Sequence, residues 1–314
     1  MQTKFPNVSK AEWLAKVEKD LKGKPLESLN WQIQGEGKVF SPFWHGEDLT
    51  DTYPAINNYR SEPCKSGIAI NVEEPAKANK QILDLLNKGA NALLLFSDKL
   101  DVVAEKDHIL DGVLLDLVDV YFQTNLPNEE LFSPKFPVYS SMNTDKIDSS
   151  LEVRFAELLR QANLGLANGE TAIPTFWEEA TDDYFLSIAS LRALRLCYAQ
   201  VAEAYGAPPD CHLTVDPWTK NQDKYGGMIS MSAICTAAIV GGATTIFVST
   251  GDTDDEGEKA FLRRVALNSM NVLHHEAHLN MVTDPAAGSY YIEALTNTIA
   301  EKIWAEFQQI SKHG

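Results

Sequence analysis

The stretch SGIAINVEEPAKANKQILDLLNKGANALLLFS, from Ser66 to Ser97, decides the fold class. An apolar run at Ser66–Val72 is typical of a buried strand, and a helical segment with acidic residues in its first turn follows it. Gly89 stands near the end of that helix, where a left-handed residue is favoured, and a second apolar run begins at Ala92. A strand, a helix, a glycine and a strand in this order indicate a βαβ unit with parallel strands.

The alternation continues along the rest of the chain. Further strands are expected at Asp119–Thr124, Phe136–Ser141, Cys211–Val215, Thr244–Ser249 and Met281–Thr283, and helices over 150–168, 184–205, 227–240, 256–275 and after Ser289. About seven strands, nearly all followed by helices, predict a (β/α)8 TIM-type barrel over residues 61–314. An open doubly wound sheet is the alternative that the same pattern allows.

The first 60 residues differ from this pattern. Apolar side chains at helical spacing predict a helix over 10–22, with Ser9 as its N-cap. The segment 25–51 is irregular and rich in aromatic residues, which need a surface to cover: Trp31, Phe40, Phe43 and Trp44. Residues 1–60 are therefore expected to be a helix and an extended arm that wraps a partner, since exposed aromatic residues mark interfaces.

Composition excludes several classes of function. The formal net charge is −17, from 44 acidic and 27 basic residues, so nucleic acid and anionic membrane are not expected as partners. The four cysteines are scattered, form no CxxC pair and suggest no disulfide framework. No apolar run approaches the roughly 20 residues that span a bilayer. A cytoplasmic protein is expected.

Two kinds of local motif are given structural interpretations. The pairs Gly226-Gly227, Gly241-Gly242 and Ala287-Gly288 match no nucleotide-binding pattern, and they are interpreted as tight turns at strand–helix junctions. His274, His275 and His278 have no evident further ligand, and they are interpreted as a solvated helix end with no metal.

The stretch CHLTVDPWTKNQD, from Cys211 to Asp223, is the best local candidate for a ligand surface. Its strand leads into a polar, aromatic loop, and the C-terminal strand ends of a barrel carry the active site. The other interpretation is a turn that Asp216-Pro217 initiates. Asp210 and His212 are separated by one residue, as in the cobalt-ligating D-x-H-x-x-G motif. Val215 stands at the position of its glycine, so we interpret the match as coincidence.

Three further segments carry a family resemblance: FLSIASLRALRLCYAQVAEAYGA, QDKYGGMISMSAICTAAIVGGATTI and DPAAGSYYIEALTNTIAEKIWAEFQQI. Together they resemble the adenosylcobalamin-dependent methylmalonyl-CoA mutase family, and LNWQIQGEGKVFSPFWHGEDLTD is similar to its N-terminal arm. The resemblance implies a (β/α)8 barrel whose axis an acyl-CoA threads. It also implies a corrin on the C-terminal face of the barrel, held by a separate domain.

The chain departs from the catalytic members of that family at several places. Asn143 stands where the family has its catalytic histidine, and no counterpart exists for the TIRQYAG-like or RNTYIYPP-like segments. His212 and Trp218 match the family's RTHCQTSGW-like segment, whereas Thr214 stands where the family has glutamine. A remnant substrate pocket would contain His212, Trp218 and Gln222. No cobalamin-binding domain is recognised within these 314 residues.

These departures together imply a small subunit of a heterodimeric mutase that is not itself catalytic. Its expected partner is a large catalytic subunit, which would bind adenosylcobalamin and isomerise methylmalonyl-CoA to succinyl-CoA. No cofactor is expected on this chain. The alternative is a stand-alone acyl-CoA-binding or residual isomerase barrel, which predicts an open axial channel, whereas a filled barrel has bulky side chains on its axis.

Overall fold

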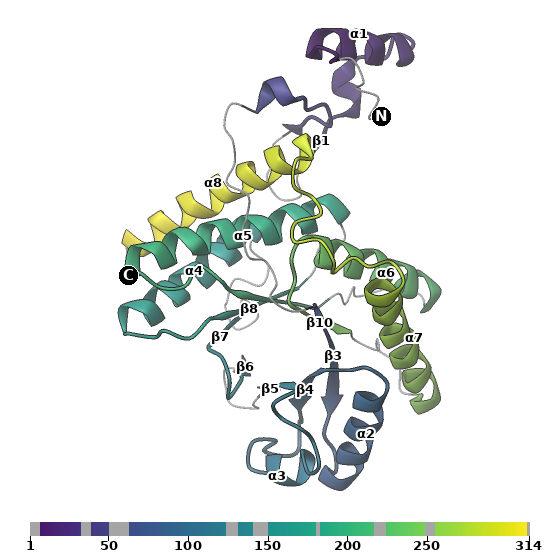
Figure 1. The fold of residues 1–314 in the computed structure, drawn as a ribbon, viewed down its shortest axis with the longest axis vertical. Coiled ribbons are helices and arrows are strands. Elements are labelled where there is room, and N and C mark those ends of the chain that lie inside the picture. The colour runs from purple at the N-terminus through teal and green to yellow at the C-terminus, as the bar shows by residue number, and fades with distance from the viewer. Residues whose placement is uncertain are drawn as a thin grey trace, which may run out of the picture.

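The structure is a computed structural model that describes residues 7–32, 39–49, 63–123, 131–140, 150–179, 183–216, 224–248 and 255–312. Eight strands form one sheet, with most of the helices around it (Figure 1). In the order of the sheet they are β6 (Leu131–Phe132), β5 (Asp119–Gln123), β4 (Ala92–Phe96), β3 (Lys65–Asn71), β10 (Thr245–Val248), β9 (His212–Asp216), β8 (Thr175–Glu179) and β7 (Val138–Ser140).

The sheet is a nearly closed barrel. β3 pairs in parallel with both β4 and β10, so the first barrel strand and the last lie side by side. β6 alone among the described barrel strands is antiparallel, and it pairs with β5. The two ends of the pairing order, β6 and β7, follow one another in the chain and lie next to each other. The (β/α)8 TIM-type prediction is confirmed, and the open doubly wound sheet is wrong.

Helices cover the outside of this barrel. They are α2 (Pro75–Asn87), α3 (Lys106–Ile109), α4 (Leu151–Ala167), α5 (Tyr184–Tyr205), α6 (Lys224–Val240), α7 (Glu256–His275) and α8 (Tyr290–Lys312). The long helix α8 packs against α5 and α4, and α2 and α7 lie on the opposite side of the molecule (Figure 1). Within the described ranges, every helix is too short or too polar to cross a membrane.

Several sequence-based boundaries need correction. β8 and β6 were not predicted, and the strand predicted at Met281–Thr283 is wrong, because this segment is a bend in which Met281 is 76% exposed. Gly226-Gly227 lies inside α6 rather than at a junction. The turn interpretation is confirmed at Gly242, which has a φ of 93°, and at Gly288, which has a φ of 80°.

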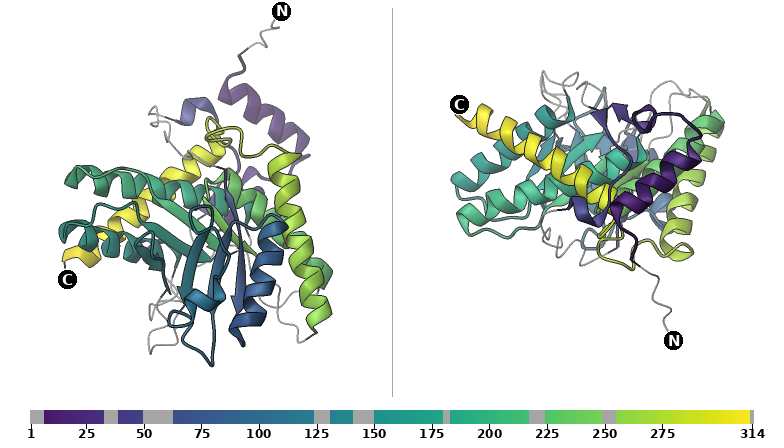
Figure 2. Two further views of the ribbon diagram at one scale, coloured as in Figure 1. Left: turned by 60° about the horizontal axis from the view of Figure 1, so that its bottom comes forward. Right: turned by 90° about the horizontal axis from the view of Figure 1, so that it is seen from above.

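The described parts of the N-terminal arm pack on the chain's own C-terminal helix (Figure 2). They comprise α1 (Lys10–Asp20), two short 3-10 helices, η1 (Leu26–Leu29) and η2 (Gly46–Asp48), and the strands β1 (Trp31–Gln32) and β2 (Val39–Phe40). The predicted N-cap is confirmed, because Ser9 forms a capping box with Glu12. Phe40 is buried, and its ring centroid lies 5.5 Å from that of Tyr291 at the start of α8.

One buried arginine organises the segment DPAAGSYYIEALT. Arg192 of α5 is 2% exposed, and its Nη2 lies 2.9 Å from Asp284 Oδ2 and 3.0 Å from Glu293 Oε1. Its Nη1 donates to Thr296 Oγ1 at 2.8 Å. Glu293 also accepts a hydrogen bond from the Gly288 amide at 3.0 Å. The polar residues of the segment therefore fix α8 to α5.

Candidate functional site

The inside of the barrel has its own hydrophobic cluster, separate from the core beneath the helices. Side chains alternate along each strand, so Ile68, Leu93 and Phe122 belong to the outer core. The inner cluster consists of buried side chains from β4, β5, β6, β8 and β10: Ala92, Leu94, Tyr121, Leu131, Trp177 and Phe247. Any ligand on the barrel axis would have to displace these side chains.

Three aromatic rings fill the axis. The Trp177 and Phe247 rings stack with centroids 4.7 Å apart, and the Tyr121 ring meets them edge-on at 5.4 Å and 5.5 Å. Each of the three side chains is 1% exposed. Gly67 on β3 provides the space, because a Cβ there would lie 2.5 Å from Phe247 Cδ1. Sequence analysis left two alternatives for the barrel axis, an open channel and a filling of bulky side chains. The described residues have the filled axis.

The hydroxyl of Tyr121 points toward a layer of threonines. Burial raises the pKa of Tyr121 to about 12, the charge of Asp119 adds to the increase, and the hydroxyls of Thr214, Thr175 and Thr245 oppose it. These threonines come from β9, β8 and β10, and Thr245 is directly paired with Thr214 in the sheet. The phenol is therefore protonated at neutral pH and is suited to hydrogen bonding rather than to acid–base catalysis.

Charged side chains close the N-terminal end of the barrel. Asp119, the first residue of β5, is buried and binds two lysines: its Oδ2 lies 2.6 Å from Lys65 Nζ, and its Oδ1 lies 3.2 Å from Lys135 Nζ. Lys135 Nζ also donates to the Val118 carbonyl at 2.8 Å. Because the active sites of TIM barrels lie at the opposite, C-terminal end, we interpret the cluster as structural.

His212 belongs to this same N-terminal end. It is the first residue of β9, so this member of the predicted ligand surface Cys211–Asp223 lies at the opposite end of the strand from Asp216, its last residue. Its ring centroid lies 4.7 Å from that of Phe136, and burial is the main cause that lowers its pKa. His212 is therefore neutral at pH 7, and it lies at the end of β9 opposite the C-terminal face.

The other two predicted pocket residues, Trp218 and Gln222, lie outside the described residues, as does Asn143, which stands at the position of the family's catalytic histidine. The remnant-pocket hypothesis stays a prediction for them. In the described part of the chain, no three histidine, cysteine, aspartate or glutamate side chains are arranged to bind a metal. His274 is 8% exposed, so the solvated-end interpretation is wrong for this histidine.

Comparison with known proteins identifies relatives by sequence. The family profile described as methylmalonyl-CoA mutase matches residues 163–314. The methylmalonyl-CoA mutase small subunit of Porphyromonas gingivalis is 26% identical, in an alignment that covers 99% of this chain and 64% of the relative. The small subunit of Streptomyces virginiae is 35% identical over 51% of this chain and 27% of the relative. The resemblance to the small subunits of this family is confirmed.

The chain spans less than two thirds of the length of each of these relatives. A protein named methylmalonyl-CoA mutase from Rhizobium meliloti is also similar, at 29% identity over 42% of this chain and 20% of the relative. Among solved structures, Burkholderia cenocepacia dihydropteroate synthase is similar with a TM-score of 0.31, at 11% identity over 69% of this chain and 94% of that one. A likeness at that level supports no conclusion about function.

Proposed function

We propose that this chain is the small, non-catalytic subunit of a heterodimeric, adenosylcobalamin-dependent methylmalonyl-CoA mutase. The observation that carries the proposal is the aromatic filling of the barrel axis by Tyr121, Trp177 and Phe247. Catalysis in this family is expected to require an acyl-CoA threaded along that axis. Here the path is occupied by side chains that are 1% exposed.

The energetic cost of opening the axis supports a structural role. Removing one large buried aromatic side chain costs about 3–5 kcal/mol, and displacing its ring into water also exposes apolar surface. A substrate would have to displace rings from β5, β8 and β10 together. Domains have net stabilities of about 5–15 kcal/mol, so this rearrangement would compete with folding itself.

The surroundings of His212 support the proposal that the partner holds the corrin. A histidine that held the cobalt would have to be accessible from the C-terminal face of the barrel, where the family resemblance places the corrin. His212 instead begins β9 and lies against Phe136 at the N-terminal end. This residue does not fit a cobalt ligand, and we assign adenosylcobalamin to the large subunit.

The N-terminal helix and arm are the surface that we assign to the partner. Two apolar side chains of this region, Val8 and Leu29, are 51% and 47% exposed although the arm is docked on α8 through Phe40. Exposed apolar groups on an otherwise polar surface favour protein–protein contact. Burying them against a large subunit would stabilise both chains, in the cytoplasm as we expect.

Co-expression with an affinity-tagged large mutase subunit tests this function. We expect a one-to-one complex that persists in size-exclusion chromatography at about 1 μM, and we expect the variants Val8→Asp and Leu29→Asp to weaken it. Leu164→Asp on α4 is the matched control, because Leu164 is 48% exposed and lies outside the arm. If the wild-type chains elute separately, the heterodimer proposal is wrong.

Calorimetric titration of the isolated chain with CoA esters tests the stand-alone alternative. The filled axis leads us to expect no binding in the micromolar range. Micromolar affinity for methylmalonyl-CoA would instead support an acyl-CoA-binding barrel and would contradict a purely structural role.

A further inference from the structure

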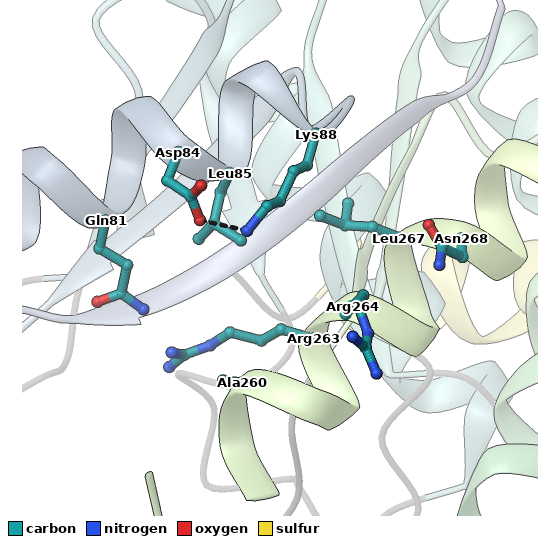
Figure 3. A pocket seen from close by; sticks show the side chains of 9 residues that line it. All are labelled: Gln81, Asp84, Leu85, Lys88, Ala260, Arg263, Arg264, Leu267 and Asn268. Carbon is teal, nitrogen blue, oxygen red and sulfur yellow. Dashed lines mark hydrogen bonds and ion pairs between the residues drawn. The ribbon is translucent and has the colours of Figure 1, made fainter. Parts of the chain in front are cut away.

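Helix α2 has a different neighbour on each of its two sides. On one side it lines a groove with α7, in which Lys88 Nζ lies 2.6 Å from Asp84 Oδ2 and Arg263 also has a partner (Figure 3). Because these charges are compensated within the chain, the groove indicates no ligand. On the other side α2 packs against α3 and the segment 110–118, which leads into β5.

Three leucines of this segment are exposed to solvent. Leu114, Leu115 and Leu117 are 69%, 48% and 68% exposed. A single exposed leucine is common on protein surfaces, but three among four successive residues form one apolar patch, and such patches often serve binding. We call residues 114–117 the leucine turn.

The leucine turn has a fixed backbone. The Leu117 amide donates a hydrogen bond to the Leu114 carbonyl at 2.9 Å, which closes the turn. The segment just before it is bound to α2, because Asn79 Nδ2 donates to the carbonyls of Ile109 and Asp111 at 3.0 Å and 2.8 Å. Binding to a surface that is already ordered costs less conformational entropy, so the leucine turn is suited to contact with a partner.

Carboxylates flank the leucine turn in the sequence. Residues 101–118 contain five acidic residues and one lysine. Glu105 is paired with His108, whereas four exposed aspartates form no ion pair with any described residue: Asp101, Asp107, Asp111 and Asp116. The pKa of His108 is raised by its hydrogen bond to Glu105, and the charges of Asp107 and Asp111 add to the increase. The segment that carries the leucines is therefore negatively charged.

The lysines at this end of the barrel do not reverse that charge. Lys135 Nζ donates to the Val118 carbonyl beside the turn, but Lys135 and Lys65 both bind the carboxylate of Asp119. When these two lysines and Asp119 are counted with the segment, six carboxylates stand against three lysines.

Apolar exposure and negative charge together determine the kind of partner that fits. A second copy of the chain would bring the same aspartates against one another in a symmetric contact, and like charges repel. Anionic lipid and nucleic acid would be repelled as well. A protein segment with apolar side chains between lysines or arginines would cover the leucines and also attract the aspartates.

We propose that the leucine turn is a docking surface for a protein segment that presents apolar side chains flanked by lysine or arginine. The surface lies at the N-terminal end of the barrel, since β5 begins at Asp119 directly after it. Helix α3, which precedes the turn, lies at the opposite end of the molecule from α1 (Figure 1). The surface is therefore separate from the arm that we assign to the large subunit.

Fluorescence anisotropy of the full chain with a labelled helical peptide of leucine and lysine tests the proposal. We expect saturable binding at about 20 mM salt and weaker binding at about 500 mM salt, because salt screens the attraction to the aspartates. A peptide with glutamate in place of lysine should bind at least about tenfold more weakly. Leu114→Ser and Leu117→Ser should each weaken binding of the lysine peptide about tenfold, since the contact loses apolar surface.

Leu164→Ser on α4 is the matched control, because Leu164 is 48% exposed and lies outside the leucine turn. It should change the affinity by less than about twofold. The leucines of the turn are exposed, so all three variants should fold. The proposal is wrong if the lysine peptide does not saturate the wild type below about 1 mM, or if Leu164→Ser weakens binding as much as Leu114→Ser does.

Two further outcomes would assign the surface to another occupant and overturn the proposal. Dimers in analytical ultracentrifugation that Leu117→Ser abolishes would identify a second copy of the chain. Loss of the complex with the large subunit in Leu114→Ser would show that the large subunit covers the turn. Failure of the heterodimer proposal alone would leave the peptide result unchanged, so the two inferences are tested separately.

Discussion

The ring of Trp177 stacks on the ring of Phe247 at a centroid distance of 4.7 Å and an interplanar angle of 22°. The two residues come from β8 and β10, which are separated in the sheet by β9. Their contact is therefore made across the inside of the barrel rather than between neighbouring strands. A small residue, Gly67 on β3, makes room for the Phe247 ring.

Gly67→Ala should destabilise the protein. The added Cβ would lie 2.5 Å from Phe247 Cδ1, and the ring is 1% exposed, so it has no free space to move into. Overpacking of this kind costs about 1–3 kcal/mol and should appear as a lower urea midpoint. Gly257→Ala in the exposed first turn of α7 is the control, with an expected change below about 1 kcal/mol. Equal midpoints for Gly67→Ala and the wild type would mean that the axis is not filled as described.

Arg192→Ala should destabilise the protein more strongly. Arg192 is the shared partner of Asp284 and Glu293, and its loss would leave two nearly buried carboxylates without this cation. Breaking a buried ion pair by removing one partner costs about 3–5 kcal/mol, measurable by chemical denaturation. Lys16→Ala breaks the exposed pair with Asp20 and should cost less than about 0.5 kcal/mol. Similar losses in the two variants would contradict a structural role for the Arg192 network.

Stability should decrease in mild acid because of His212. Its folded-state pKa is lowered from 6.5, mainly by burial, so the unfolded chain binds the proton more readily than the folded one. The contribution of the neutral imidazole is complete above pH 6.5 and is lost as the pH falls through the lower folded-state value. The charged groups that act on it are Asp119, Arg195, Lys65 and Asp210.

The measurement is the urea midpoint of the wild type and His212→Asn between about pH 8 and pH 5. We expect the variant to lose less stability over this range. His108→Gln is the control, since Glu105 raises the pKa of this exposed histidine and gives a pH dependence of the opposite sign. A pH profile that His212→Asn leaves unchanged would exclude the burial of a neutral imidazole.

Tyr291→Ala should release the N-terminal arm. Its ring lies 5.5 Å from the buried ring of Phe40, which joins the arm to α8. We expect trypsin to cut after Lys22 about tenfold faster, because local opening costs less when this packing is lost. Tyr184→Ala, at a side chain that is 39% exposed, should leave the cleavage rate near that of the wild type. Unchanged cleavage of Tyr291→Ala would show that other contacts hold the arm.

Sequence analysis identified the barrel and most of its elements because parallel strands and their helices have strong local signals. It missed β8, whose sequence TFWEE ends in two acidic residues and gives only a short apolar run. It also placed a strand at Met281–Thr283 because the apolar Met281 and Val282 are adjacent there, although both are exposed. A short apolar run in the sequence does not indicate whether another strand lies beside it to form the hydrogen bonds of a sheet.

In the candidate site, too, local sequence patterns predicted some residues and gave no indication of others. The family match identified His212 as a candidate residue. Its position at the N-terminal end of the barrel depends on where β9 begins, and local patterns predict strand bounds only approximately. The aromatic filling had no local signal at all. Tyr121, Trp177 and Phe247 each stand beside another apolar residue, and both faces of a barrel strand are buried.

By itself the sequence determined the barrel, the arm and the resemblance to mutase small subunits, because strand–helix alternation and segment identity are properties of neighbouring residues. Only the tertiary structure decided that the axis is filled and that Asp284, Glu293 and Thr296 surround Arg192. The physical reason is distance along the chain. Trp177 and Phe247 are 70 positions apart, and only the closure of the barrel brings their rings into contact.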